Sequence, residues 1–300
     1  MAIVKFQDLM ADAEQGGYAV GYFESWNLES LLAVADAAQA SHSPVILGFS
    51  GRYLPDLARR IVSDPLAPYA RMAEAVARGL SVPTCLLFNE SPSLDWVQTA
   101  IREGFGLVMY TDEHLAPEEL ELRVARLVQK AHAVGVAVEG EMDALPGLGG
   151  ELNAMPQHLH LSEPARSRAF IERTGVDALA VNVGQVHMHA RCQVRLNLPH
   201  LAKLRAEIPV PLALHGASSL APADIAEAVR LGIRKINVGS VLKKAFFEAM
   251  RDACSRVDGH YNPYEVAGSG YDQDVMVAGR LAMRRVTENL MQTFGSAGKA

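Results

Sequence analysis

Short apolar segments and longer amphipathic segments alternate along almost the whole chain. The apolar segments are rich in Val, Ile and Leu, which is typical of strands that are buried on both faces. They predict strands at 19–24, 44–50, 83–89, 106–110, 137–142, 178–184, 211–215 and 235–238. The amphipathic segments predict helices at 28–41, 68–78, 94–103, 117–134, 164–174, 198–207, 222–231, 243–257 and 273–293.

The order of these elements indicates the fold class. Strand-then-helix units in series predict an α/β protein, a (β/α)₈ TIM barrel that forms a single domain over residues 1–300. A doubly wound open sheet uses the same alternation and is the alternative. The barrel is favoured because eight strands of similar length follow one another without a break in composition. The loop at 145–161 would then lie at the catalytic face.

Composition and charge exclude several classes of protein. A hydrophobic content of 49% is enough to form a sizeable core, and a net charge of −6 argues against a nucleic-acid partner. Three widely spaced cysteines, Cys85, Cys192 and Cys254, predict free thiols and no disulfide framework. No signal-peptide pattern and no apolar run of about 18 residues are found. We therefore expect a cytoplasmic protein without a membrane partner.

Two histidines stand at the ends of neighbouring predicted strands, His187 after the sixth and His215 at the end of the seventh. Their side chains can converge, because active sites of such barrels lie where the strands end. Neutral imidazole is the commonest metal ligand, and Glu90 or Glu141 could complete a site with an open position. The alternative interpretation is that each histidine is a hydrogen-bonded core residue.

Two turns rich in small residues follow the last two strands. Gly216-Ala217-Ser218 and Val238-Gly239-Ser240 each precede a helix. Small residues let backbone N–H groups approach an anion, and a helix N-terminus favours negative charge. Barrels often bind phosphate after strands seven and eight. Tight turns need glycine in any case, so a purely structural role is the alternative.

These residues resemble a known family, the class II (metal-dependent) ketose-bisphosphate aldolases. The resemblance covers nearly the whole chain. It rests on residues 19–23 (AVGYF), 174–181 (TGVDALAV), 214–218 (LHGAS), 235–238 (KINV), 244–246 (KAF) and 294–300 (FGSAGKA). It implies a barrel, commonly dimeric or tetrameric, that acts on a phosphorylated sugar. In the family a metal ion stabilises the enediolate of dihydroxyacetone phosphate.

The resemblance also implies roles for single residues. His187 and His215 would be metal ligands, and Asn237 would face the enediolate. Glu141 matches a carboxylate that the family keeps at the end of strand five. The residues expected around the substrate and its phosphate are Ser50, Gly184, Arg191, Gly216, Ser218, Gly239 and Ser240. Arg191 stands where tagatose-type members have a lysine.

The chain departs from the family at the end of the third strand. The family has His-x-Asp-His there, which supplies a catalytic acid and a zinc ligand, whereas this chain has Leu87-Phe88-Asn89-Glu90. Asn89 occupies the catalytic position, but its amide cannot give up a proton and become a stable base. Glu90 is an acceptable metal ligand. We expect Zn²⁺ as the cofactor, with Mn²⁺ or Fe²⁺ as alternatives that suit a carboxylate better.

Three hypotheses for the function follow. The first is a metal-dependent aldolase-type lyase for a phosphorylated ketose, in which Glu24, Glu90 or Glu151 takes over proton transfer. The second is a metalloenzyme that uses the same enediolate chemistry on another sugar-like substrate. The third is a non-catalytic homologue that binds a phosphosugar. We favour the first, because the histidine pair and the phosphate turns are retained.

Overall fold

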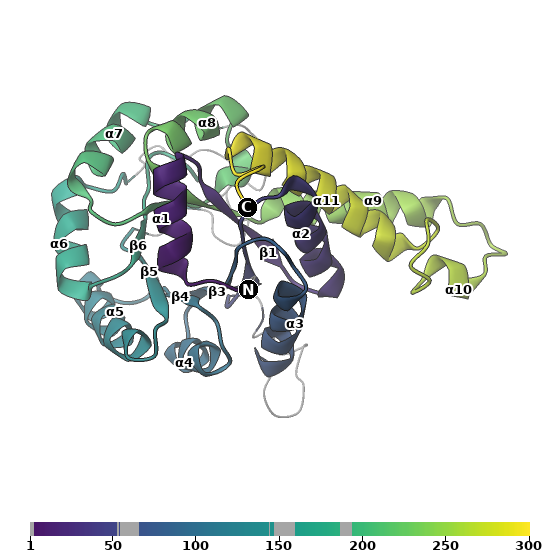
Figure 1. Cartoon of the computed structure of the whole chain (residues 1–300), viewed down its shortest axis with the longest axis horizontal. Helices are drawn as coiled ribbons and strands as arrows, with labels where there is room; N and C mark the ends of the chain where they lie inside the picture. Colours follow the sequence, from purple (N-terminus) through teal and green to yellow (C-terminus); the bar gives the residue numbers. More distant parts are fainter. Residues whose placement is uncertain (1–2, 53, 55–65, 144, 147–159, 187–193) are drawn as a thin grey trace.

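The computed structural model describes the chain except for residues 1–2, 53, 55–65, 144, 147–159 and 187–193. Within the described part, eight parallel strands close into one barrel in the order in which they occur in the chain (Figure 1). They are β1 (Val20–Ser25), β2 (Val45–Ser50), β3 (Thr84–Ser91), β4 (Leu107–Tyr110), β5 (Ala137–Glu141), β6 (Ala178–Ala180), β7 (Leu212–Leu214) and β8 (Ile233–Val238). The predicted barrel is confirmed, and the open sheet is excluded because β8 pairs with β1.

Helices surround the barrel as predicted, except for α10, which lies away from the barrel (Figure 1). They are α2 (Leu28–Ser41), α3 (Leu66–Arg78), α4 (Leu94–Arg102), α5 (Pro117–His132), α6 (Pro164–Thr174), α7 (Leu198–Glu207), α8 (Pro222–Arg230), α9 (Ser240–Ser255), α10 (Pro263–Val266) and α11 (Val275–Thr293). A single 3₁₀ turn (Ala217–Ser219) follows β7. Asn27 caps α2 through a reciprocal pair of hydrogen bonds with Ser30.

Two of the described helices, α1 and α10, were not predicted from the sequence. The helix α1 (Phe6–Gly16) precedes β1, and its buried residues Phe6, Leu9, Met10 and Ala13 follow a helical spacing that could have revealed it. These side chains join the cluster inside the barrel that includes Tyr22 and Leu87. The helix therefore closes one end of the barrel, and the candidate functional side chains lie at the opposite end.

Strand β6 is shorter than predicted, since it ends at Ala180 rather than near 184. Beyond it the backbone turns, because Gly184 has a φ of +109° and its N–H donates to the Asn182 side chain. The N–H of Val183 donates to the Gln185 side chain in the same turn. Polar side chains thus supply the hydrogen bonds that a neighbouring strand would otherwise supply to these backbone N–H groups.

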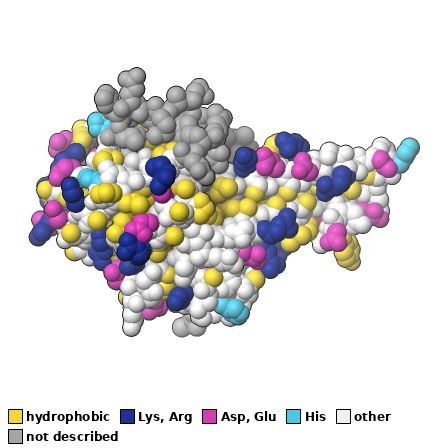
Figure 2. Space-filling view, turned by 90° about the horizontal axis from the view of Figure 1, so that it is seen from above, with side chains coloured by type: hydrophobic (Ala, Val, Ile, Leu, Met, Phe, Trp, Pro, Cys, Tyr) yellow, Lys and Arg dark blue, Asp and Glu magenta, His cyan; other side chains and the backbone are white. Residues whose placement is uncertain are grey.

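The C-terminal helices extend beyond the barrel. Helix α11 packs on α9 and α2, and the far ends of α9 and α11, with α10 between them, form a projection that we call the arm, residues 247–281 (Figure 1). Figure 2 shows a band of hydrophobic side chains that runs from the barrel along this projection. None of the described helices is both long and apolar enough to cross a membrane.

Candidate active site

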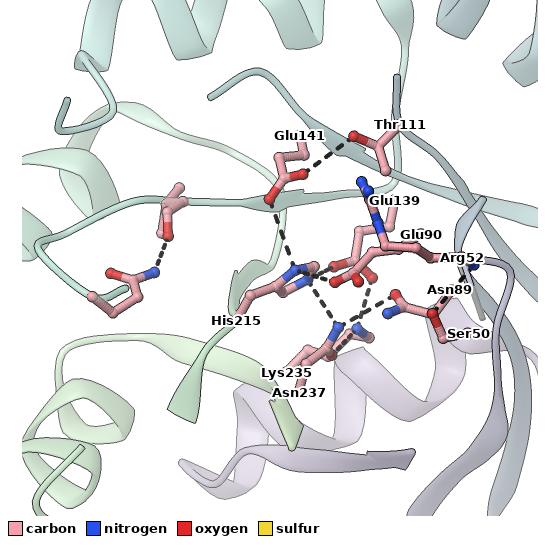
Figure 3. Close-up of polar contacts among 12 residues, drawn as sticks. Ser50, Arg52, Asn89, Glu90, Thr111, Glu139, Glu141, His215, Lys235 and Asn237 are labelled. Atoms are coloured by element: carbon pink, nitrogen blue, oxygen red, sulfur yellow. Dashed lines mark hydrogen bonds and ion pairs between the residues drawn. The ribbon is translucent and has the colours of Figure 1, made fainter. Parts of the chain in front are cut away.

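The barrel interior is polar where the strands end. Alternation along a strand sends every second side chain inward, so Glu139 and Glu141 of β5 face the same space as Lys235 and Asn237 of β8. Figure 3 shows these side chains converging on His215, which follows β7 directly. All five of these residues are at least nine-tenths buried.

His215 lies between carboxylates. Its Nε2 is 2.8 Å from Oε1 of Glu139, and its Nδ1 is 3.1 Å from Oε1 of Glu90 and 3.8 Å from Oε1 of Glu141 (Figure 3). Burial alone would lower the pKa of His215. The hydrogen bonds to Glu139 and Glu90 outweigh burial and raise this pKa to about 10. Both ring nitrogens thus face carboxylate oxygens, and Nε2 also lies 2.9 Å from the amide nitrogen of Asn237.

A buried ion pair lies next to His215. The Nζ of Lys235 is 2.8 Å from Oε2 of Glu139, and neither side chain is exposed. Burial would raise the pKa of Glu139, but Lys235 and His215 hold it below its usual value. Lys235 also donates to the side chain of Asn237, whose amide donates to Oδ1 of Asn89 over 3.3 Å. Glu139 therefore fixes the His215 ring from behind, while Lys235 fixes Glu139.

Sequence reasoning assigned no role to Lys235 or to Glu139. The sequence did indicate a partner for Lys235, because a lysine within an apolar strand is buried and its charge must be paired with a carboxylate. Lys235 is two residues before Asn237 and so shares its face. The partner was not evident, since Glu139 lies on β5, three strands away in the closed barrel.

Glu141 has a different environment from Glu139. Its Oε2 accepts a hydrogen bond of 3.4 Å from the hydroxyl of Thr111. Burial, together with the nearby charges of Glu90 and Glu139, raises the pKa of Glu141 to about 7 against the opposing effect of His215. A carboxyl group of this kind can hold or release a proton near neutral pH.

The end of β3 carries the unusual pair Asn89 and Glu90. Asn89 lies opposite Ser50 of β2 in the strand register and is 3% exposed. Glu90 has a φ of +47°, a left-handed backbone that is strained for a residue with a Cβ. The register between β3 and β4 shifts between Phe88 and Ser91 at the same point. This irregularity brings the Glu90 carboxylate to Nδ1 of His215.

The candidate phosphate-binding turns lie side by side. The N–H of Val241, in the first turn of α9, donates to Oγ of Ser218 over 3.3 Å, so the turn after β7 touches the one after β8. Gly216 has a φ of +69°, and a Cβ there would lie 3.5 Å from the carbonyl oxygen of Val186. The turns that contain Gly216, Ser218, Gly239 and Ser240 are therefore neighbours, and Gly216 lies near Val186, two residues after Gly184.

Three candidate site residues lie outside the described part of the chain, Glu151, His187 and Arg191. Among the described residues, no group of three or more His, Cys, Asp and Glu side chains is arranged to hold a metal ion. The donor chemistry nevertheless fits a divalent ion. His215 turns Nδ1 toward the carboxylates of Glu90 and Glu141, while Glu139 holds Nε2, as carboxylates do behind metal-bound histidines. His187, the other ligand expected from the sequence, is outside the described residues.

Comparisons with known proteins agree on one family. The family model for class-II fructose-bisphosphate aldolase matches residues 4–299. A protein of Thermus caldophilus named fructose-bisphosphate aldolase is 31% identical, with 98% of each chain aligned. The crystal structure of the YdjI aldolase from Escherichia coli K12 superposes with a TM-score of 0.79, at 26% identity and 99% coverage of both chains. A structure from Coccidioides immitis, described as a putative fructose-1,6-biphosphate aldolase, has a TM-score of 0.81 at 24% identity, covers 98% of this chain and 97% of its own, and supports the fold alone.

Proposed function

Because this chain belongs to the class-II fructose-bisphosphate aldolase family, it is an aldolase-type enzyme, and we propose that it forms and cleaves a C–C bond in a phosphorylated ketose with the help of a divalent metal ion. The ketose would be assembled from dihydroxyacetone phosphate and an aldehyde. The observation that carries the proposal is the geometry of His215, whose Nδ1 faces Glu90 and Glu141 while Glu139 holds Nε2.

We propose that His187, His215 and Glu90 hold the metal ion, which would be Zn²⁺, with Mn²⁺ or Fe²⁺ as alternatives. The ion would supply a Lewis acid that stabilises negative charge on the substrate oxygens. Glu139 keeps His215 oriented, and Lys235 neutralises Glu139 inside the barrel. Asn237 would donate a hydrogen bond to the oxygen that becomes negative, as its amide now does to Asn89.

Glu141 is proposed to carry the proton. Asn89 cannot do so, and Glu24 is paired with Lys243 at 2.6 Å. Glu90 is engaged with Nδ1 of His215, whereas Glu141 is farther from the ring and has a pKa near 7. The phosphate would lie against the turns that contain Gly184, Gly216, Ser218, Gly239 and Ser240, where α9 begins. Ser50 would also contact the substrate, and Arg191, which lies outside the described residues, is proposed as the cation for the phosphate.

The test is exchange of the hydroxymethyl C–H proton of dihydroxyacetone phosphate with D₂O, followed by NMR on the purified, metal-loaded full chain. We expect exchange that a chelator abolishes and that Zn²⁺, Mn²⁺ or Fe²⁺ restores. Glu141→Gln should lower the exchange rate at least 100-fold, while the surface control Glu172→Gln should not change it. Absence of both exchange and cleavage of any ketose phosphate would contradict the proposal.

Asn89→Asp is the second test, because it introduces the carboxylate that the family resemblance leads us to expect at this position. We expect the exchange rate to rise at least ten-fold if proton transfer limits the reaction. Asn89→Ser removes the amide without adding a carboxylate and serves as the control. An unchanged rate in Asn89→Asp would mean that Glu141 already performs this step fully.

A further inference from the structure

Tyr22 of β1 carries a hydroxyl that is buried inside the barrel and forms no hydrogen bond with any described residue. The residue is 1% exposed. A buried hydroxyl without a partner loses its hydrogen bonds to water and gains none in return, so such groups are rare in folded proteins. Nothing in the proposed chemistry at His215 uses this hydroxyl.

Tyr22 faces the space in which the candidate site lies. Val20 and Tyr22 belong to the cluster inside the barrel, whereas Phe23 belongs to the larger cluster that includes the surrounding helices. The side chains of β1 thus alternate between the two faces of the sheet, and Tyr22 points inward. The register pairs Tyr22 with Asn237 of β8, and the amide of Asn237 lies 2.9 Å from Nε2 of His215 (Figure 3).

The charges around the hydroxyl indicate which end of the barrel it faces. Burial, together with the carboxylates of Glu24, Glu90 and Glu139 in decreasing order of effect, raises the pKa of Tyr22 well above its ordinary value. The effect of a charge falls with distance, so the hydroxyl lies toward the strand ends, where Glu24 and Glu90 stand. It keeps its proton there and can donate a hydrogen bond to an oxygen.

The neighbours of Tyr22 hold its ring without bonding to its hydroxyl. The Nζ of Lys235 lies 5.5 Å from the centroid of the ring, within the range of a cation–π contact. Glu24, Glu90 and Glu139 are each engaged with nitrogen atoms of other side chains. The ring is therefore fixed in place, while its donor is left for a group that the unliganded protein does not supply.

The proposed reaction develops negative charge at two oxygens. The first belongs to the enediolate, and Asn237 and the metal ion are proposed above to stabilise it. The second is the aldehyde oxygen, which receives an electron pair when the hydroxymethyl carbon of dihydroxyacetone phosphate bonds to the aldehyde carbon. A hydrogen-bond donor that is already in place lowers the energy of such a developing charge.

We propose that Tyr22 is a catalytic residue whose hydroxyl donates a hydrogen bond to the aldehyde oxygen while the C–C bond forms or breaks. This inference rests on the proposed aldolase function. In the synthetic direction the enediolate carbon supplies the electron pair of the new bond, and the π pair of the aldehyde moves to its oxygen. That oxygen takes a proton from solvent, and the proton that Glu141 removed from carbon returns to solvent. Tyr22 keeps its own proton, and no oxidant or reductant is needed.

The first experiment uses Tyr22→Phe, which removes only the hydroxyl, in the metal-loaded full chain. One assay is proton exchange of dihydroxyacetone phosphate with D₂O, which involves no aldehyde. The other is addition of dihydroxyacetone phosphate to glycolaldehyde, glyceraldehyde or glyceraldehyde 3-phosphate. We expect exchange to stay within about two-fold and addition to fall at least 100-fold, since one donor to a developing oxyanion is worth about 10²–10³ in rate.

Tyr110→Phe is the matched control for this experiment. Tyr110 is also 1% exposed, but its hydroxyl is bonded to Arg123 and Asp112. Both rates should be unchanged in this variant.

Three outcomes would overturn the inference. Tyr22→Phe could add aldehydes as fast as the wild type, or it could lose exchange and addition together, which would indicate a structural role. The wild type could also exchange the proton but join dihydroxyacetone phosphate to none of the aldehydes. The proposed function would stand in the first two cases, because wild-type exchange persists, whereas a wild type without exchange would contradict the function itself.

The second experiment measures stability without catalysis, by urea unfolding of the metal-free protein. Tyr22→Phe should leave the urea midpoint unchanged or raise it, because no hydrogen bond is lost. Tyr110→Phe should lower the midpoint, because its hydroxyl is bonded. A lower midpoint for Tyr22→Phe would mean that the hydroxyl already has a partner in the unliganded protein, and the inference would fail.

The third experiment asks which end of the substrate the hydroxyl serves. Phosphoglycolohydroxamate mimics the enediolate and has no oxygen that corresponds to the aldehyde. Its Kd for the metal-loaded protein, measured by calorimetry, should differ between Tyr22→Phe and the wild type by less than about two-fold. A Kd at least ten-fold higher in Tyr22→Phe would assign the hydroxyl to the enediolate instead and overturn the inference.

Discussion

Lys235 and Glu139 form an ion pair with no exposure to solvent, and Glu139 also contacts His215. Desolvation makes such a pair worth little compared with a well-packed apolar pair, but removing one partner leaves a buried charge. The role of the pair is therefore to fix the orientation of His215. The contribution of this ion pair to the free energy of unfolding can be measured apart from catalysis.

We predict that Lys235→Met lowers the free energy of unfolding by about 3–5 kcal/mol, because Glu139 loses its cation. The double variant Lys235→Met/Glu139→Gln should recover part of this loss. Urea unfolding of the metal-free protein at pH 7 provides the measurement. The exposed pair Arg168 and Glu172 serves as control, and Arg168→Met should cost less than about 1 kcal/mol. If the effects of the two single substitutions on the free energy of unfolding simply add up in the double variant, the two residues are not coupled.

Glu90 combines a strained backbone with a proposed metal ligand. Its φ of +47° favours glycine, so Glu90→Gly should be more stable than Glu90→Ala by about 1 kcal/mol in urea unfolding of the metal-free protein. Both variants should lose metal affinity at least ten-fold, as measured by competition with a chelator. A Gly variant that is less stable than the Ala variant would indicate that the backbone at Glu90 is not strained.

Much of the candidate site could be predicted from the sequence at the scale of single residues. Asn89, Glu90, Glu141, His215 and Asn237 were placed together because polar residues at the ends of parallel strands meet at one edge of the barrel. Their hydrogen-bond partners could not be predicted. The pairing of each carboxylate with a nitrogen of His215 depends on small differences in atomic position, and these are set by the stagger of the strands.

Most predicted helices and strands are present with small shifts in their bounds. The exceptions are α1 and α10, which were not predicted, and β6, which is shorter than predicted. The pattern of α1 spans only three turns, and its partner surface is the end of a barrel that does not exist until the chain is folded. An amphipathic segment near the start of a chain gives no indication of what it covers.

We predict that α1 is part of the barrel core. Leu9 is 1% exposed and belongs to the cluster inside the barrel, so Leu9→Ala should lower the free energy of unfolding by about 2–5 kcal/mol. Asp8→Ala, at an exposed position of the same helix, is the matched control and should change it by less than about 0.5 kcal/mol. A small effect of Leu9→Ala would mean that α1 packs only loosely.

The whole molecule has one closed barrel and one projecting arm. We expect the chain to unfold as a single domain, in one urea transition that fluorescence and circular dichroism report at the same midpoint. Separate midpoints would contradict this prediction and would indicate that the arm unfolds on its own.

The arm also bears on assembly, because Phe247, Tyr261, Tyr264 and Tyr271 are more than half exposed. Exposed aromatic side chains gathered on one projection are typical of a protein interface. We predict a homodimer or homotetramer by light scattering, and Tyr264→Lys combined with Tyr271→Lys should shift it toward smaller species. A monomer at micromolar concentration would contradict this prediction.

The sequence by itself determined the alternation of strands and helices, the barrel class, the family and the polar positions at the strand ends. These properties depend on local periodicity and on short motifs, which are present before the chain folds. Only the tertiary structure decided that Lys235 pairs with Glu139, that Glu90 adopts a left-handed backbone to reach His215, and that the Tyr22 hydroxyl is buried without a partner among the described residues. Each of these depends on residues from distant strands and helices, and closure of the barrel alone brings them into contact.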